Sequence, residues 1–240
     1  HFSRVDPTYT PAVLMNGCGN RIAHNRFYHS PGHAMRIEGN DYIIECNEIF
    51  EVVRESDDQG GLDMWANPSY RGVVLRYNYW HDIGNERACG QAGVRLDDAI
   101  SGVWIYGNIF RRCSAGGFGA IQIHGGKDNK ILNCVFADCK FAISFSSWGP
   151  ARWKQFLDGQ WVQDKLHKEV EISQPPYSTK YPDLARLYED EGISSVWRNL
   201  AYNCGSLLTR DRGVQDLMDN TVTLEDPGFV DAAQGDFSLK

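Results

Sequence analysis

The sequence predicts an all-β fold, a parallel β-helix in which the chain winds as a solenoid of short stacked strands, with a mostly helical insertion. Three observations predict it: a six-residue pattern that recurs at the spacing of one coil, a second series of alternating segments between its copies, and one long stretch without alternation. We expect residues 1–240 to form a single domain.

The first pattern has six copies, "IAHNRF", "IECNEI", "LRYNYW", "IYGNIF", "ILNCVF" and "VWRNLA". Successive copies are 22 to 31 residues apart, except for one step of 65 residues, and a period in the twenties is typical of a solenoid coil. Apolar residues alternate with polar ones in each copy, so we expect each copy to form a strand with one buried face. The fourth residues of the copies are Asn25, Asn47, Asn78, Asn108, Cys134 and Asn199. We interpret the asparagines as structural and expect their side chains to form hydrogen bonds with the backbone of the turns and with one another.

A second series of short segments follows these copies: "AMRIEG", "GLDMWA", "GVRLDD", "AIQIHG" and "AISFSS". Each segment has two apolar residues at the same two positions, and the side chains of a strand alternate between its faces. The ten residues expected to point inward are therefore Met35, Ile37, Leu62, Met64, Val94, Leu96, Ile121, Ile123, Ile143 and Phe145. The outward face then carries two columns, Arg36, Asp63, Arg95, Gln122 and Ser144 in the first, and Glu38, Trp65, Asp97, His124 and Ser146 in the second.

Residues 149–192 lose the alternation and contain two helix-like stretches, around residues 153–170 and 183–189, separated by "QPPY". This insertion either braces the stack or supplies aromatic side chains such as Trp148, Trp153 or Trp161 to one end of a groove. The ending "LEDPGFVDAAQGDFSLK" is rich in turn residues and predicts a finish to the solenoid rather than another full coil.

The composition excludes several classes of partner. A net charge of -7, from 31 acidic and 24 basic residues, provides no basic field for phosphate backbones, so we expect no nucleic acid partner. No apolar stretch approaches the roughly 20 residues needed to span a bilayer, so we expect no membrane partner. The seven cysteines show no C-x-x-C pair, and we expect most of them to be small buried residues.

The outward columns predict a groove for carbohydrate. They gather Asp63, Trp65, Arg95, Asp97 and His124 in place of the Lys, Thr and Ser of an idle sheet face. The same coils have the longest turns, since "SDDQGG" is predicted as a turn before the strand "LDMW" and "NPSYRG" as an enlarged turn after it, and loops that grow on one side of a solenoid often form a binding face. The aromatic residues expected to pack on sugar rings are Trp65, Tyr70 and Trp148.

Pairs of aspartates predict cleavage of a glycosidic bond. Strand geometry places the α-carbons of Asp63 and Asp97 roughly 8 Å apart, within the roughly 6.5 to 9.5 Å carboxyl separation of inverting glycosidases. Asp98 follows Asp97, and repulsion between adjacent carboxylates beside an aromatic ring predicts that one of them has a raised pKa. Asp57 and Asp58 repeat this arrangement, and turn capping remains an equal interpretation of either pair.

Several segments together resemble a known family: "DDQGGLDMWANPSYRGVVLRYNYWHDIG", "GVRLDDAISGVWIYGNIF", "AIQIHGGKDNKILNCVFADC" and "YPDLARLYEDEG" are similar to the right-handed parallel β-helix glycoside hydrolases that include a pectin-directed α-L-fucosidase and a xylanase. The resemblance spans most of residues 16–231. It implies a right-handed β-helix and an extracellular or periplasmic location. Because the family's enzymes are considerably longer, it also implies that this chain is a fragment.

The resemblance implies one catalytic acid from "SDDQGG" and one from "VRLDD", so the catalytic candidates are Asp58, Asp97, Asp98 and Asp57. The family pattern usually has an uncharged residue where this chain has Asp63, which we therefore keep as a binding or alternate catalytic residue. The substrate-binding candidates are Asp63, Trp65, Arg95, His124, Glu38, Arg36, Tyr70, Lys127 and Trp148.

The predicted function is hydrolysis of glycosidic bonds in a plant or other complex polysaccharide, without a cofactor or metal. One alternative is a lyase that acts on a uronate-containing glycan, in which Lys127 or Arg95 is the base and calcium neutralises the substrate carboxylate. Another is a carbohydrate-binding solenoid without catalysis, in which the aspartates only cap turns.

Overall fold

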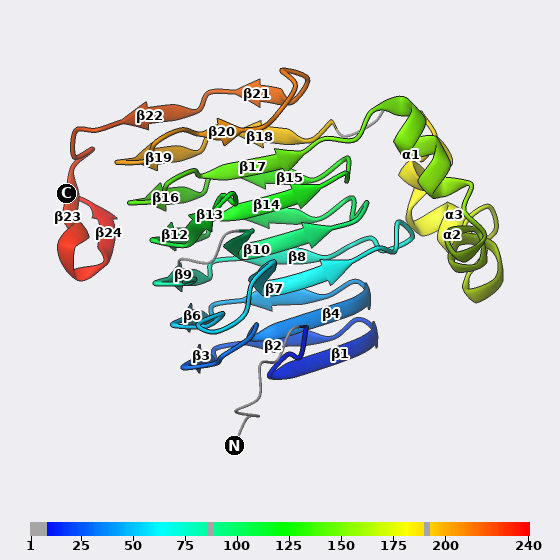
Figure 1. The fold of residues 1–240 in the computed structure, drawn as a ribbon, viewed down its shortest axis with the longest axis horizontal. Helices are drawn as coiled ribbons and strands as arrows, with labels where there is room; N and C mark the ends of the chain where they lie inside the picture. Colours follow the sequence, from blue (N-terminus) through cyan, green and yellow to red (C-terminus); the bar gives the residue numbers. More distant parts are fainter. Residues whose placement is uncertain (1–8, 86–88, 190–192) are drawn as a thin grey trace.

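The computed structural model describes residues 9–85, 89–189 and 193–240. The chain winds into a stack of coils whose strands form three parallel sheets (Figure 1). Strands from successive coils pair in parallel and in register in all three sheets. The predicted parallel β-helix is confirmed, although the coils supply strands to three sheets and not to the two that the sequence patterns predicted.

The three sheets differ in strand length. The first sheet has the longest strands: β1 Val13–Cys18, β4 Met35–Asn40, β7 Gln59–Trp65, β10 Gly90–Asp97, β14 Ile121–His124, β17 Ile143–Ser146 and β20 Leu208–Thr209, with β13 Ser114–Gly116 antiparallel to β10. The second sheet contains β2 Arg21–Ala23, β5 Ile43–Glu45, β8 Val74–Arg76, β11 Trp104–Tyr106, β15 Lys130–Leu132, β18 Ser195–Trp197 and β21 Asp216–Met218. The third contains β3 Arg26–Tyr28, β6 Glu48–Phe50, β9 Tyr79–His81, β12 Ile109–Arg111, β16 Val135–Ala137, β19 Leu200–Tyr202 and β22 Thr221–Thr223.

Each copy of the six-residue pattern forms a corner between the second and third sheets, so the expected single strand was wrong. In one copy Leu75 lies in β8 and Trp80 lies in β9, and Tyr77 between them has a φ of 56°. The third residue of all six copies has a positive φ, which ends one strand and turns the chain into the next. The apolar first and sixth residues therefore enter the core from two different sheets.

The predicted column of asparagines forms a hydrogen-bonded ladder at these corners. The backbone N–H and Nδ2 of Asn47 donate to Oδ1 of Asn78, and the same two groups of Asn78 donate to Oδ1 of Asn108. Nδ2 of Asn78 also donates to the backbone carbonyl oxygen of Ile44. The structural interpretation is confirmed, and Asn220, which the pattern search missed, extends the ladder by one coil.

The core runs inside the three sheets. The ten residues that were expected to point inward from the first sheet are all buried. Trp80, Phe110 and Phe136 stack on one another from successive coils, with ring centroids 6.0 and 5.1 Å apart. All seven cysteines are free, and four of them, as expected for most, are buried: Cys113, Cys134, Cys139 and Cys204.

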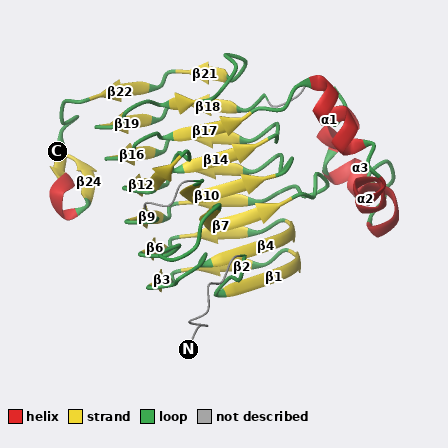
Figure 2. Ribbon diagram, in the orientation of Figure 1, coloured by secondary structure: helices red, strands yellow, loops and turns green. Residues whose placement is uncertain are grey.

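The insertion lies beside one edge of the stack, and Figure 2 shows that it carries most of the helix in the structure. Its helical segments are α1 Pro150–Leu157, α2 Gln160–Asp164, a π-helical turn Lys165–Glu169, α3 Tyr177–Lys180 and a 3-10 turn Pro182–Arg186. Residues 190–192 of the predicted insertion lie outside the described residues. An ion pair of 2.6 Å between Arg71 Nε and Asp183 Oδ2 fastens the insertion to a turn of the stack, as the bracing role requires.

The segment after β22 forms a hairpin and not a coil, as its turn-rich sequence predicted. Strands β23 Phe229–Asp231 and β24 Asp236–Leu239 are antiparallel and flank the 3-10 turn Ala232–Gln234. Phe229 and Phe237 pack against Ala137 of the third sheet, at the side of the stack opposite the insertion (Figure 1). No helix in the described part of the chain is long and apolar enough to cross a membrane.

Candidate functional site

A cavity of about 550 Å³ opens on the outward face of the first sheet. Eight of the predicted catalytic and binding residues line it: Arg36, Asp58, Asp63, Trp65, Arg95, Asp97, Asp98 and His124. The remaining lining residues were not among the predicted site residues, and they are Tyr9, Met64, Cys89, Phe118, Gln122, Ser146 and Arg210. The site therefore lies on the coils that the outward columns indicated.

Strand register brings these side chains together. The pairing of β7 with β10 places Asp63 beside Arg95 and Trp65 beside Asp97. The pairing of β10 with β14 places Arg95 beside Gln122 and brings the next outward residue, His124, to the neighbourhood of Asp97. Since side chains alternate across each strand, all of these residues face outward. The predicted outward columns are confirmed here.

Arg95 is the electrostatic centre of the cavity. Its Nη2 lies 2.8 Å from Oδ1 of Asp58 and 2.9 Å from Oδ2 of Asp97, and its Nη1 lies 3.8 Å from Oδ1 of Asp63. Burial lowers the pKa of the Arg95 guanidinium, but the charges of the three aspartates outweigh burial and raise it. A single buried cation thus holds three carboxylates around one position.

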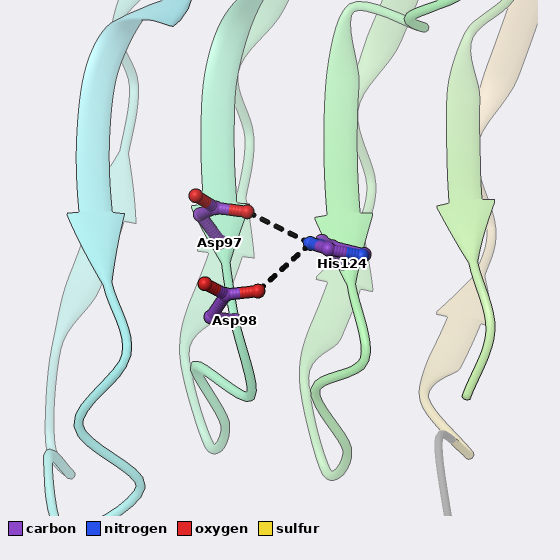
Figure 3. Close-up of side chains that lie close together, drawn as sticks. All are labelled: Asp97, Asp98 and His124. Atoms are coloured by element: carbon purple, nitrogen blue, oxygen red, sulfur yellow. Dashed lines mark hydrogen bonds and ion pairs between the residues drawn. The ribbon is translucent and has the colours of Figure 1, made fainter. Parts of the chain in front are cut away.

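Asp97, Asp98 and His124 form a second cluster (Figure 3). His124 Nδ1 lies 3.0 Å from Oδ1 of Asp97 and 3.0 Å from Oδ1 of Asp98, and Trp65 Nε1 donates to Oδ2 of Asp98 over 3.0 Å. Burial lowers the pKa of His124, but the hydrogen bonds to both aspartates outweigh burial and raise the pKa to about 9. His124 therefore carries a proton at neutral pH.

Asp98 does not have the raised pKa that was expected for one acid of this pair. Burial raises the pKa of Asp98, but hydrogen bonds from His124 and Trp65 outweigh burial and lower it. The expectation considered repulsion from Asp97 and did not include the imidazolium that both carboxylates share. The proton that was assigned to a carboxylic acid is therefore held by His124.

The raised pKa of His124 makes stability depend on pH. A group whose pKa is higher in the folded state contributes stability that is full below its unfolded pKa, near 6.5, and is lost as the pH rises through about 9. Relative to a His124→Gln variant, we expect the wild type to lose on the order of 1 to 2 kcal/mol of unfolding free energy over this range. Urea titrations at several pH values measure it, and identical pH profiles for the two proteins would contradict the assignment.

Asp57 and Asp58 have different roles. Asp57 accepts hydrogen bonds from the backbone N–H groups of Asp58, Cys89 and Gly90 and from Nε2 of Gln91. Burial raises the pKa of Asp57, but the backbone hydrogen bonds outweigh burial and lower it. Asp57 therefore caps the turn, and it does not line the cavity.

Asp58 faces the cavity, with Oδ1 bound to Arg95 and Oδ2 accepting a hydrogen bond of 2.7 Å from the Tyr9 hydroxyl. Its backbone has a φ of 57°. The turn at this point is shorter than predicted because β7 begins at Gln59, so residues 59–61 of "SDDQGG" belong to the strand.

Asp63 lines the cavity but is almost fully buried. Its side chain is 5% exposed, and Oδ2 is bound to Nδ1 of His33, which is buried, and to the backbone N–H of Gly60. The carboxylate that meets Asp97 on the same nitrogen of Arg95 is that of Asp58 and not that of Asp63. The geometry therefore suits Asp63 to orienting Arg95.

Four further predicted residues lie outside the main cavity. Glu38 and Tyr70 line a second cavity. Trp148 is buried and packs against His124 in a T-shaped arrangement with ring centroids 5.3 Å apart. Lys127 is fully buried, and its Nζ donates to the carbonyl oxygen of Arg186 in the insertion over 3.1 Å. Lys127 is thus placed to hold the insertion and not to contact a substrate in the cavity.

Of the cavity residues that were not predicted, Met64, Gln122 and Ser146 lie within the aligned segments, whereas Tyr9, Cys89, Phe118 and Arg210 lie outside them. Tyr9 precedes the first coil, and Phe118 lies in the segment that leads into β14. Arg210 follows β20, and its Nη2 donates to Oε1 of Gln122 over 2.8 Å. Because Leu208 and Thr209 pair with Ile143 and Ser144, Arg210 takes the position of the inward-pointing Phe145, so extending the outward columns to this coil would not have predicted it. We find no sequence signal for Tyr9 or Phe118.

One group among the described residues has donor atoms spaced for a metal ion: Asp97, Asp98 and His124, whose donors lie within 4.8 Å of one another. Calcium, which the lyase alternative requires, takes roughly six to eight oxygen ligands. A protonated imidazole is a poor calcium ligand, and Nη2 of Arg95 already neutralises Asp97 from 2.9 Å. The cluster therefore suits a proton better than calcium.

A stack of three parallel sheets with a polar cavity on its outward face defines the class of β-helix domains, which are commonly carbohydrate-active. Residues 11–155 match the family described as right handed beta helix region, and the chain belongs to this family. The description agrees with the predicted handedness and names no activity. No curated protein and no solved structure was found to match the chain.

Proposed function

We propose that the cavity hydrolyses a glycosidic bond of a neutral sugar in a complex polysaccharide, with Asp58 and Asp97 as the pair of carboxylates. The observation that carries this proposal is that one nitrogen of Arg95 binds an oxygen of each. Two carboxylates on opposite sides of one bond are what most glycoside hydrolases require. The similarity of "SDDQGG" and "VRLDD" to the β-helix glycoside hydrolases supports the same pair.

The spacing of this pair favours retention of configuration. The two oxygens cannot be further apart than the distances of 2.8 and 2.9 Å laid end to end, because both lie on the same Arg95 nitrogen. That limit is below the roughly 6.5 Å at which inverting enzymes begin and is compatible with the roughly 5 to 5.5 Å of retaining ones. The inverting pair of Asp63 and Asp97 is disfavoured because His33 and Gly60 occupy Asp63.

Burial divides the roles between the two carboxylates. The Asp97 side chain is 8% exposed, and Arg95 and His124 fix its two oxygens, so it is the pre-oriented nucleophile that would bond to the sugar carbon. The Asp58 side chain is 34% exposed, so in its protonated form it can donate a proton to the leaving oxygen, and the carboxylate that results can take a proton from the attacking water. His124 and Asp98 hold a proton beside Asp97, and this contact limits the movement of the Asp97 side chain.

The charges that line the cavity favour a neutral sugar over a uronate. When Asp58 carries the proton of the general acid, the other three aspartates and Glu38, which pairs with Arg36, balance the three arginines and the protonated His124, so a substrate carboxylate finds no excess positive charge. Of the two candidate lyase bases, Lys127 is buried and bound to the insertion, and Arg95 is held by three aspartates. A glycoside hydrolase therefore accounts for more of the site than a lyase does.

The first test is to incubate the protein with aryl glycosides of neutral sugars and with plant cell-wall polysaccharides, and to assay products for reducing ends and for unsaturated ends. We expect saturated products, and proton NMR of the first-formed product should show the anomeric configuration of the substrate. Unsaturated products would identify a lyase. Glycan binding without any product would identify a binding module, and an inverted product would exclude Asp97 as nucleophile.

A further inference from the structure

A second cavity, of about 480 Å³, lies where the insertion covers the turns of the first coils. From the coils it is lined by Gly17, Cys18, Glu38, Gly39, Asn40, Asp41, Asn67, Ser69 and Tyr70, and from the insertion by Lys165, Glu169, Val170, Pro176, Tyr177, Lys180 and Tyr181. One wall thus comes from the solenoid and the other from the helical segment. The cavity exists only because the insertion folds over this edge.

The charged side chains in the second cavity are paired with one another or with a neighbour. Lys180 Nζ binds Oδ2 of Asp41, which also accepts a hydrogen bond of 2.7 Å from the Tyr181 hydroxyl. Lys165 Nζ lies 2.6 Å from Oε1 of Glu169. Glu38 Oε1 accepts a hydrogen bond of 2.8 Å from Nε of Arg36. An ionic ligand would therefore have to break an existing ion pair.

What the cavity offers to a ligand is aromatic rings and neutral polar groups. Tyr70, Tyr177 and Tyr181 supply the rings. Asn40 is 5% exposed, and its Nδ2 has no acceptor at hydrogen-bonding geometry in the described chain, although the hydroxyls of Tyr177 and Tyr181 lie near it. Rings with amide donors suit the flat faces and hydroxyls of a neutral sugar.

The two cavities are adjacent along one strand. Arg36 and Glu38 both point outward from β4, and Arg36 lines the main cavity while Glu38 lines the second. Their hydrogen bond of 2.8 Å forms part of the boundary between the cavities. Trp65, which lies under the Arg36 guanidinium at 5.5 Å, also packs against Trp161 of the insertion with ring centroids 5.6 Å apart. A ligand that fills both cavities must pass over this boundary.

We propose that the second cavity binds a neutral sugar unit of the same glycan chain, away from the bond that is cleaved, so that the substrate is an oligosaccharide or polysaccharide and not a single glycoside. This inference rests on the proposed function and adds a second binding site to it. The insertion then has a specific role, because it forms the far wall of the site and selects for chain length.

The test is calorimetric titration of the Asp97→Asn variant with cello-, xylo- and manno-oligosaccharides of increasing length. We expect affinity for at least one series to rise with length. Adding Tyr177→Ala should remove that rise and weaken binding of the longest member about tenfold, since a ring contact and its buried area are lost. Tyr177→Phe keeps the ring and deletes the hydroxyl, so it should lose less affinity than Tyr177→Ala. Because the ring is kept, this variant separates the loss of the ring contact from misfolding of the insertion.

The matched control is Tyr188→Ala, because Tyr188 is a half-exposed tyrosine of the same insertion that lines neither cavity. It should keep the full dependence on length. Affinity that is independent of length, or equal losses for Tyr177→Ala and Tyr188→Ala, would overturn the second site. Binding does not require cleavage, so failure of the proposed hydrolysis would leave this titration unchanged, whereas cleavage of aryl glycosides without any length dependence would overturn the second site alone.

Discussion

Replacing Asp97 with asparagine is expected to lower kcat by at least about 10³-fold, because the amide cannot form the covalent bond to the sugar carbon that the proposed nucleophile forms. Asparagine has nearly the same shape, so Arg95 keeps its contacts with Asp58 and Asp63 and the fold should be retained. What is lost is the anion between Arg95 and His124 that would bond to the sugar. Initial rates on the best aryl glycoside measure the effect.

A second readout distinguishes a catalytic role for Asp97 from a structural one. Because Asp97 and Asp98 together raise the pKa of His124 to about 9, the Asp97→Asn variant should titrate His124 at a lower pH in an NMR experiment. Asp158→Asn is the matched control, since Asp158 is exposed and pairs with Lys154 at the surface. Full activity in Asp97→Asn, with the pKa of His124 lowered, would remove Asp97 from the mechanism.

The sequence predicted the position of the cavity better than it predicted the contacts of the residues that line it. Register places Asp97 beside Trp65, and it follows directly from the two-residue alternation of the strands. The register does not predict that the Arg95 guanidinium contacts Asp58, Asp63 and Asp97 together, because these contacts depend on the direction of a long side chain. The choice between Asp57 and Asp58 likewise depends on which carboxylate turns toward the backbone amides.

The corner between the second and third sheets could not be predicted because no residue type marks it. The third position of the six-residue pattern is occupied by His24, Cys46, Tyr77, Gly107, Asn133 and Arg198, and all have a positive φ. Glycine is the residue that usually signals this conformation, and it occurs in one copy of six. The other five adopt it at some cost, which the asparagine ladder offsets by bonding to the backbone on both sides.

Replacing Asn78 with alanine is therefore expected to lower the free energy of unfolding by on the order of 4 kcal/mol, because several buried groups lose their partners at once. Oδ1 of Asn78 accepts two hydrogen bonds from Asn47, and its Nδ2 donates to the carbonyl oxygen of Ile44 and to Oδ1 of Asn108. Alanine leaves these groups buried and cannot replace any of the bonds. Urea denaturation followed by circular dichroism measures the change.

Position along the ladder provides the control. Asn25 lies at the exposed start of the ladder and donates to Asn47, but water can reach its other groups, so Asn25→Ala should cost only about 1 kcal/mol. If Asn25→Ala and Asn78→Ala lowered the free energy of unfolding equally, burial would not determine how much each asparagine of the ladder contributes to stability. The larger loss at Asn78 follows from its place in the middle of the stack, where each asparagine supports the coils before and after it and thus the register that brings Asp97 and His124 together.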